Sequence, residues 1–337
     1  MYGTPTNQPT NRESGLDIIR VSAILFVIAG HFLYLHTNFM KTPITDINLF
    51  FQGTFMSLFY VSVPIFVLLT GYLHRRKRYS NIDIKTFKGV FKVINAYIFF
   101  AILYILFRKF YLHQDVSFFA TIKSILNFSG IPYGWYIELY IGLFLLMPFL
   151  NILFEKLDTK KNRLFLIGVC IFNSSMPIFF NRGGIQILPN YFDIFGAITF
   201  YFTGSYIAEY KPKINKFILM SIIGLLCLTD SGVSALLNRA FAPIGGQVWS
   251  IYYLVIATAL FLILYDLKCN SKLLSKLSIY TLDIYMCCGI FDLVYYPYFK
   301  NHFFESQQQF LPYIIIIVPL VFFSSAIVAF IFPVIKG

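Results

Sequence analysis

Two ionisable side chains, Arg20 and His31, lie inside an apolar stretch, residues 16–36, that is long enough to cross a lipid bilayer. Eleven residue steps of about 100° bring a helix back to within about 20° of its starting direction. Both side chains are therefore expected on one helix face, about 16 Å apart along the axis. An imidazole exchanges a proton near neutral pH, and a guanidinium binds phosphate. Because ionisable groups are costly inside a membrane, the pair predicts a functional site.

Both side chains also have a structural interpretation. His31 would then only hydrogen-bond a neighbouring helix, and Arg20 would extend to the headgroups of the inner leaflet. Asp17, three residues before Arg20, is expected to pair with it. The cost of burying His31 favours the functional interpretation, in which the imidazole activates a hydroxyl or carries an acyl group.

The composition excludes a soluble globular protein. Of the 337 residues, 58% are hydrophobic, 20% aromatic and only 12% charged, with a mean hydropathy of +0.71. The chain is therefore predicted to be a polytopic membrane protein. The net charge of +12 comes from short basic runs between apolar stretches, which is typical of loops facing anionic lipid and not of nucleic-acid binding. The five cysteines show no metal-ligand spacing, so neither a disulfide nor a metal site is expected.

The apolar stretches predict an all-α, polytopic membrane bundle of ten transmembrane helices. Polar residues 1–14 are expected to form a disordered cytoplasmic tail, and residues 15–337 a single membrane domain. With both termini in the cytoplasm, the loops on that side hold 19 Lys and Arg and the outer loops hold 7, in keeping with the positive-inside rule. The predicted helices are 15–37, 47–73, 90–110, 135–154, 164–180, 191–210, 217–233, 249–267, 277–297 and 310–335.

Carboxylates and further histidines are the next candidates. Glu138 starts the fourth predicted helix at about the depth of His31 and is a second candidate catalytic residue. Asp283 and Asp292 are nine residues apart, about 180° around a helix, so at most one of them is expected in a site. The remaining histidines are expected to be ordinary solvated side chains: His36, His74, His113 and His302.

Binding and path-lining candidates lie near the ends of the helices. Lys88 and Lys92 lie at the start of the third predicted helix and are predicted to form a positively charged entrance for an anionic cytosolic ligand. The alternative is that these lysines only signal topology. Three aromatic residues are candidates for binding a ligand or for lining a path through the membrane: Tyr34, Tyr72 and Trp135.

Three motifs, in this order along the chain, resemble those of the family 3 membrane acyltransferases, whose core has ten helices with both ends cytoplasmic. Arg20 and His31 match the R-x10-H signature. Residues 66–73, FVLLTGYL, are similar to the F-x-L-S-G-[FY]-L motif, with Thr70 in place of serine. Residues 134–151, GWYIELYIGLFLLMPFLN, are similar to the tryptophan-led fourth helix.

The chain departs from the family pattern before the third helix. The family's R-x-x-R is replaced by a segment with Lys88, Gly89 and Lys92, in which Gly89 stands in the place of one arginine. Lysine keeps the charge but lacks the bidentate fork of arginine.

The resemblance implies a multi-pass cell-membrane enzyme that transfers an acyl group, most often acetyl, from cytosolic acetyl-CoA to a hydroxyl of a cell-surface or lipid-linked glycan. In such an enzyme His31 would be the base or a transient acyl carrier, with Glu138 as the second catalytic group. Arg20 would hold a phosphate or the thioester carbonyl, and Lys88 and Lys92 would steer the CoA. Richness in Phe, Ile, Lys, Asn and Tyr is compatible with a bacterial source.

The alternative is a polysaccharide or small-solute transporter, in which Arg20 and His31 are coupling or gating groups. A transporter predicts paired interrupted helices in repeated halves, and the sequence shows no internal repeat.

The predicted orientation can be tested by labelling single cysteines with an impermeant maleimide in intact cells. From the charge asymmetry, we expect cysteines near Arg76 and Lys160 to be protected and those near Asp115 and Gln307 to react. Labelling at position 76 in intact cells would contradict the ten-helix arrangement.

Overall fold

The computed structural model describes residues 14–75, 77, 82–181, 185–189, 192 and 195–332. Within these residues the chain is all-helical and has no strand, apart from one isolated bridge between Pro43 and Ala240. The predicted tail lies outside the described residues, except that Ser14 already begins the first helix. Position 76 also lies outside them.

In chain order the α-helices are α1 (Ser14–Leu35), α2 (Ile47–Phe59), α3 (Ser62–His74), α4 (Lys88–Phe110), α5 (Phe118–Leu126), α6 (Trp135–Lys156), α7 (Lys160–Phe180), α8 (Phe195–Tyr210), α9 (Lys216–Leu236), α10 (Ile251–Leu264), α11 (Lys272–Ile279), α12 (Thr281–Phe303) and α13 (Phe310–Ile331). Three short 3-10 helices join them: η1 (Phe39–Lys41), η2 (Ile84–Phe87) and η3 (Gln307–Gln309).

The multi-pass membrane architecture is confirmed. Seven helical segments of the described chain are long and apolar enough to cross a membrane: α1, α2 with α3, η2 with α4, α6, α7, α9 and η3 with α13. The bent pair α11 and α12 makes an eighth. The other two predicted spans correspond to α8 and α10, which have only 16 and 14 residues. The count of ten and the cytoplasmic placement of the termini therefore stay predictions.

Two of the predicted spans are interrupted helices. The span 47–73 is divided into α2 and α3 because Pro64, in the first turn of α3, lacks the N–H that would continue the hydrogen bonding of α2. The span 277–297 is entered through α11, which meets α12 with a bend of 75°. The sequence analysis expected both spans as single helices, and it did not predict α5.

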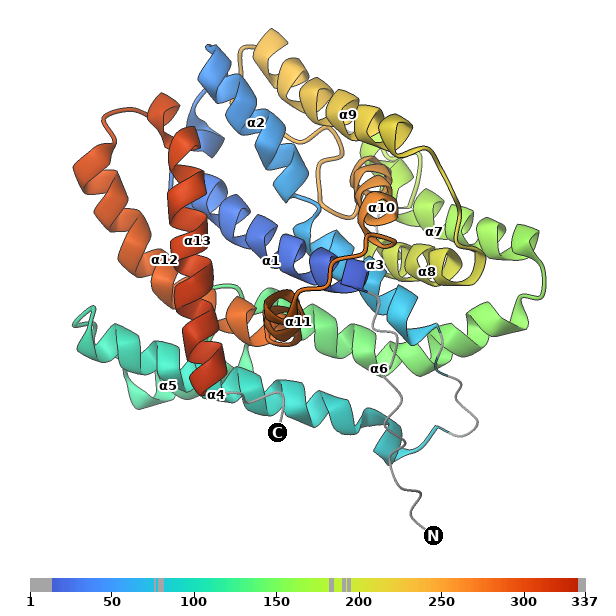
Figure 1. Cartoon of the computed structure of the whole chain (residues 1–337), viewed down its shortest axis with the longest axis horizontal. Helices are drawn as coiled ribbons and strands as arrows, with labels where there is room; N and C mark the ends of the chain where they lie inside the picture. The colour runs from blue at the N-terminus through green and yellow to red at the C-terminus, as the bar shows by residue number, and fades with distance from the viewer. Residues whose placement is uncertain are drawn as a thin grey trace.

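α1 runs through the middle of the bundle (Figure 1), in contact with α2, α3, α10, α11, α12 and α13. Ile19 and Ala23 in its first half are buried in an apolar cluster shared with α3, α8 and α10. Ile28 and Phe32 in its second half are buried in another cluster, shared with α4, α12 and α13. α1 is therefore held by packing along its whole length, and any side chain on it has a fixed position relative to its neighbours.

α3 and α8 approach so closely that glycine is needed on both sides of the crossing. A Cβ atom on Gly71 would collide with the backbone carbonyl oxygen of Tyr201, and one on Gly204 would collide with that of Leu68. Ser205 Oγ donates a hydrogen bond across the same crossing to the carbonyl oxygen of Gly71, at 3.3 Å. Small residues allow this kind of close helix packing in membranes, so the glycine of the FVLLTGYL motif has a packing role.

We expect Gly71→Ala to lower the thermal unfolding midpoint of the detergent-solubilised protein. The added methyl group meets backbone, which cannot rotate away, and overpacking of this kind costs about 1–3 kcal/mol. Gly142→Ala is the matched control, because the space around Gly142 is open to 4 Å and alanine is the better helix former. Equal unfolding midpoints for the two variants would show that the α3–α8 crossing is not tight.

Candidate active site

Arg20 and His31 of α1 each line a cavity. The inner cavity, of about 190 Å³, is lined by Arg20 together with residues of α3, α6 and α12. The outer cavity, of about 410 Å³, is lined by His31 together with residues of α2, α3, α12 and the loop before α6. Tyr285 of α12 lines both cavities, so they follow one another along the side of α1 that carries Arg20 and His31. This arrangement agrees with the eleven-residue spacing. Inner and outer refer to the predicted orientation.

Arg20 is oriented by a buried carboxylate. Its Nη1 atom donates to Asp17 Oδ1 at 2.9 Å, which is the ion pair expected from the sequence. Asp17 is itself buried and accepts hydrogen bonds from two serines of α11, from Ser278 Oγ at 2.7 Å and from Ser275 Oγ at 3.1 Å. Charge-assisted bonds of this kind are about twice as strong as neutral ones, so the guanidinium is held at the wall of the inner cavity.

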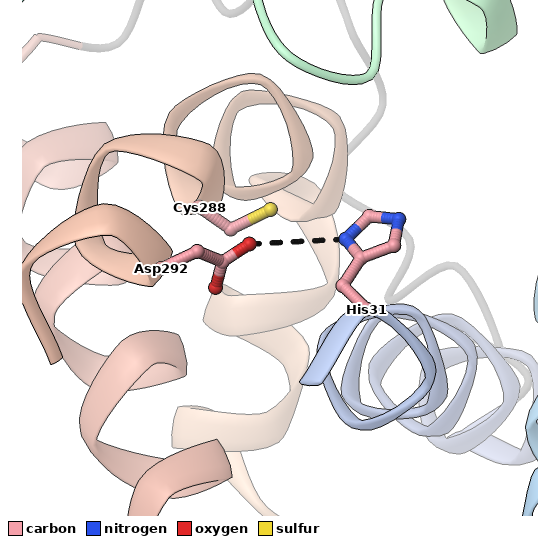
Figure 2. A group of neighbouring side chains, drawn as sticks. All are labelled: His31, Cys288 and Asp292. Carbon is pink, nitrogen blue, oxygen red and sulfur yellow. Dashed lines mark ion pairs between the residues drawn. The ribbon is translucent and has the colours of Figure 1, made fainter. Parts of the chain in front are cut away.

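His31 lies between a carboxylate and an aromatic ring. Its Nδ1 atom faces Asp292 Oδ2 of α12 at 3.9 Å, as Figure 2 shows, which is ion-pair distance but longer than a hydrogen bond. The ring stacks on Tyr133, with 3.5 Å between ring centroids and 29° between planes. Since Nδ1 is buried against α12, Nε2 is the nitrogen left to face the outer cavity. Nδ1 of His31 thus lies next to Asp292, and Nε2 is available to exchange a proton with a molecule in the outer cavity.

Tyr133 connects Asp292 to a second histidine. Its hydroxyl donates to Asp292 Oδ2 at 2.8 Å and lies 3.1 Å from His36 Nε2. Burial, reinforced by the nearby Lys300, lowers the pKa of His36 from 6.5 to about 4, so its ring is neutral at pH 7. Because the Tyr133 proton is directed to Asp292, His36 Nε2–H is the donor to the tyrosine oxygen. The prediction that His36 is an ordinary solvated side chain is therefore wrong.

Three side chains on one face of α12 lie near His31. Tyr285, Cys288 and Asp292 are spaced three and four residues apart and so share a face of the helix. Asp292 is buried and is the aspartate of α12 that lies at His31. This agrees with the expectation that at most one of Asp283 and Asp292 belongs to the site.

The same stripe provides a candidate metal-ligand set. The ligand atoms of His31, Cys288 and Asp292 all lie within 4.8 Å of one another, and zinc accepts all three types. However, Cys288 Sγ donates to the carbonyl oxygen of Tyr285 at 3.1 Å, and Asp292 Oδ2 already accepts from Tyr133. A protonated thiol and a hydrogen-bonded carboxylate fit proton transfer by His31 better than metal binding. That no metal takes part remains a prediction.

The other residues proposed from the sequence lie in different places. Tyr34 and Trp135 line the outer cavity with His31. Glu138 is exposed on α6 and lines neither of the two cavities, so the structure does not bring it to His31. Lys88 and Lys92 are exposed on the first turns of α4 and also lie outside both linings.

Tyr72 is buried against α10. It is only 2% exposed, its ring packs against Phe261 of α10, and it borders a separate cavity of about 830 Å³. The reason is helical geometry, because the face of α3 that lines the inner cavity carries Phe66, Thr70 and Leu73. Tyr72 therefore lines neither the cavity of Arg20 nor that of His31, and its role as an acceptor or path-lining residue stays a prediction.

Asp292 and Tyr133 were not identified as partners of His31 from the sequence. A carboxylate inside an apolar helix marks a candidate, but its partner depends on which helices meet. Tyr133 precedes α6 in a loop among many tyrosines, and nothing local distinguishes it.

A comparison with protein families gives a match over residues 13–333, nearly the whole chain, to a family described as an acyltransferase domain. The chain belongs to the family 3 acyltransferases. Neither a curated protein nor a solved structure matches it. The R-x10-H pair of this acyltransferase is therefore the pair that lines the two cavities, and Thr70 of its FVLLTGYL motif lines the inner cavity beside Arg20.

Proposed function

We propose that this acyltransferase moves an acyl group, most simply acetyl, from acyl-CoA on the cytoplasmic side to a hydroxyl of an extracytoplasmic glycan. One observation carries the proposal. Nε2 of His31 faces the outer cavity, and Nδ1 faces the buried carboxylate of Asp292. On the same helix, Arg20 is held by its ion pair at the inner cavity. Donor and acceptor on opposite sides of a membrane require such a line of groups.

The reaction assigns a role to each nitrogen of His31. Nε2 removes the proton from the sugar hydroxyl as its oxygen attacks the thioester carbonyl carbon. The new C–O bond forms, the C–S bond breaks, and the proton passes from the imidazole to the departing thiolate of CoA. Asp292 stabilises the imidazolium that exists between these two proton transfers and keeps Nδ1 directed to itself, so that Nε2 faces the cavity.

The donor end depends on Arg20. A guanidinium presents planar, paired N–H groups that match a phosphate or a carbonyl oxygen, and its charge cannot be lost. Asp17 holds the group at the cavity wall, so little rotamer entropy is lost when an anion binds. Lys88 and Lys92 remain proposed as a steering surface for CoA, outside the cavity itself.

The interrupted helices favour one other function. α11 and α12 meet at a bend of 75°, and α2 and α3 are separated by Tyr60 and Val61, both beside the candidate site. Broken helices are typical of transporters. The two interpretations differ in chemistry. An acyltransferase in detergent releases free CoA thiol from acetyl-CoA when a glycan acceptor is present, whereas a transporter does not.

We expect His31→Gln to abolish glycan acylation, because glutamine keeps the size and hydrogen bonding of histidine but cannot take a proton. A positioned base is worth about 10² to 10⁴ in rate. The measurement is release of CoA thiol together with NMR of the glycan, at matched expression. His302→Gln is the matched control, because His302 is exposed and lines neither cavity. Acylation by His31→Gln within a few fold of the parent would refute the mechanism.

We expect Arg20→Lys to weaken acyl-CoA binding although the charge is retained, because the bidentate fork is lost. Loss of one charge-assisted hydrogen bond corresponds to a decrease of roughly 10- to 100-fold in affinity. The measurement is binding of labelled acetyl-CoA to purified protein, with Arg239→Lys, at an exposed loop position, as control. Parental affinity in Arg20→Lys would assign Arg20 to the lipid headgroups instead.

A further inference from the structure

Tyr285 is the residue common to the linings of the two cavities, among the described residues. On its inner side lie Arg20 and Thr70, and on its outer side lie His31 and Tyr133. Its side chain is 2% exposed, so it is packed on all sides between the two spaces. The Tyr285 side chain is therefore part of the wall between the two cavities.

Two directional contacts orient the Tyr285 side chain within this packed interior. The Tyr285 hydroxyl donates to the backbone carbonyl oxygen of Tyr133 at 2.7 Å, and its ring meets Tyr136 edge-on, with 5.1 Å between centroids. A single hydrogen bond of this type contributes only about 0.5–1.5 kcal/mol. The backbone on either side is fixed more firmly, because Gly289 packs directly against Pro132 and leaves no space for a Cβ atom. If α12 and the loop stay in place, movement of the side chain alone requires this hydrogen bond to break and its packed neighbours to shift.

The proposed reaction needs a path through this wall. Arg20 and His31 lie eleven residues apart on α1, about 16 Å along the axis. The reacting atoms must come within about 3–3.5 Å of each other for transfer. A donor held at Arg20 can therefore deliver its acyl carbon to a hydroxyl at His31 only as a thin extended chain that passes Tyr285.

We propose that Tyr285 is a gate between the donor cavity and the acceptor cavity, which turns aside to admit an extended acyl thioester. This inference rests on the proposed function. When the gate is closed, the inner cavity is separated from the water of the outer side, and the thioester is protected from hydrolysis.

The test measures whether the cavities are connected, without relying on catalysis. Thr70→Cys places a thiol in the lining of the inner cavity, and Ser62→Cys places one in the lining of the outer cavity. A small membrane-impermeant methanethiosulfonate reagent is added only to the side on which the outer cavity opens. Labelling is located by peptide mass spectrometry, so that the native cysteines are distinguished from positions 62 and 70.

With Tyr285 present, we expect position 62 to be labelled and position 70 to stay unlabelled. In Tyr285→Ala, position 70 is expected to become labelled at a rate close to that of position 62. Tyr285→Phe keeps the ring and loses the hydrogen bond, so it should raise labelling at position 70 by roughly two- to tenfold. This variant also keeps the test decisive if Tyr285→Ala does not fold.

The outcomes separate this proposal from the proposed function. Equal labelling at position 70 with and without Tyr285 would refute the gate, whatever the enzyme activity. If labelling at position 70 depends on Tyr285 but the His31→Gln variant still acylates the glycan, the gate is supported and the proposed catalytic role of His31 is refuted. If both hold, Tyr285→Ala should also hydrolyse acetyl-CoA faster than the parent when no acceptor is present.

Discussion

A polar side chain in the apolar part of a helical membrane protein must find its partner on a neighbouring helix, because neither lipid nor bulk water is available to it. On one side of α1, two ionisable side chains are connected to polar groups of neighbouring helices. Arg20 is oriented by Asp17, which is anchored to Ser278 of α11, and His31 faces Asp292 of α12. The position of α1 against these two helices therefore fixes both ends of the candidate site, and most other contacts of α1 are apolar packing.

The 75° bend between α11 and α12 makes this double contact possible. A straight helix would present a single face to α1. The bent pair instead places Ser278 of α11 beside Asp17, near the start of α1, and Asp292 of α12 beside His31, near its end. The second break, between α2 and α3, places Tyr60 and Ser62 in the wall of the outer cavity. Non-helical backbone at membrane depth is tolerated where it lines a cavity, so both irregularities coincide with the site.

The sequence predicted correctly the first helix, the common side of Arg20 and His31 on it, and the ends of most spans, because apolar length and helical period are local properties. It did not predict the breaks, since Pro64 is also compatible with an unbroken membrane helix. It named Glu138 as a second candidate catalytic residue and left open whether Asp283 or Asp292 belongs to a site. The depth of a residue can be counted along a chain, but the direction of its side chain depends on which helices meet. For the same reason the sequence did not show that Tyr72 faces α10.

Tyr133 contacts both the His31–Asp292 pair and Tyr285. Its ring stacks on His31, its hydroxyl donates to Asp292, and its carbonyl oxygen accepts the hydrogen bond that holds Tyr285. A donor chain that displaces Tyr285 therefore removes a contact from the residue that packs against the catalytic imidazole. An interior packed to crystal-like density transmits such a change to its neighbours. In the proposed mechanism, arrival of the thioester at Tyr285 would therefore be coupled to the position of His31 through Tyr133.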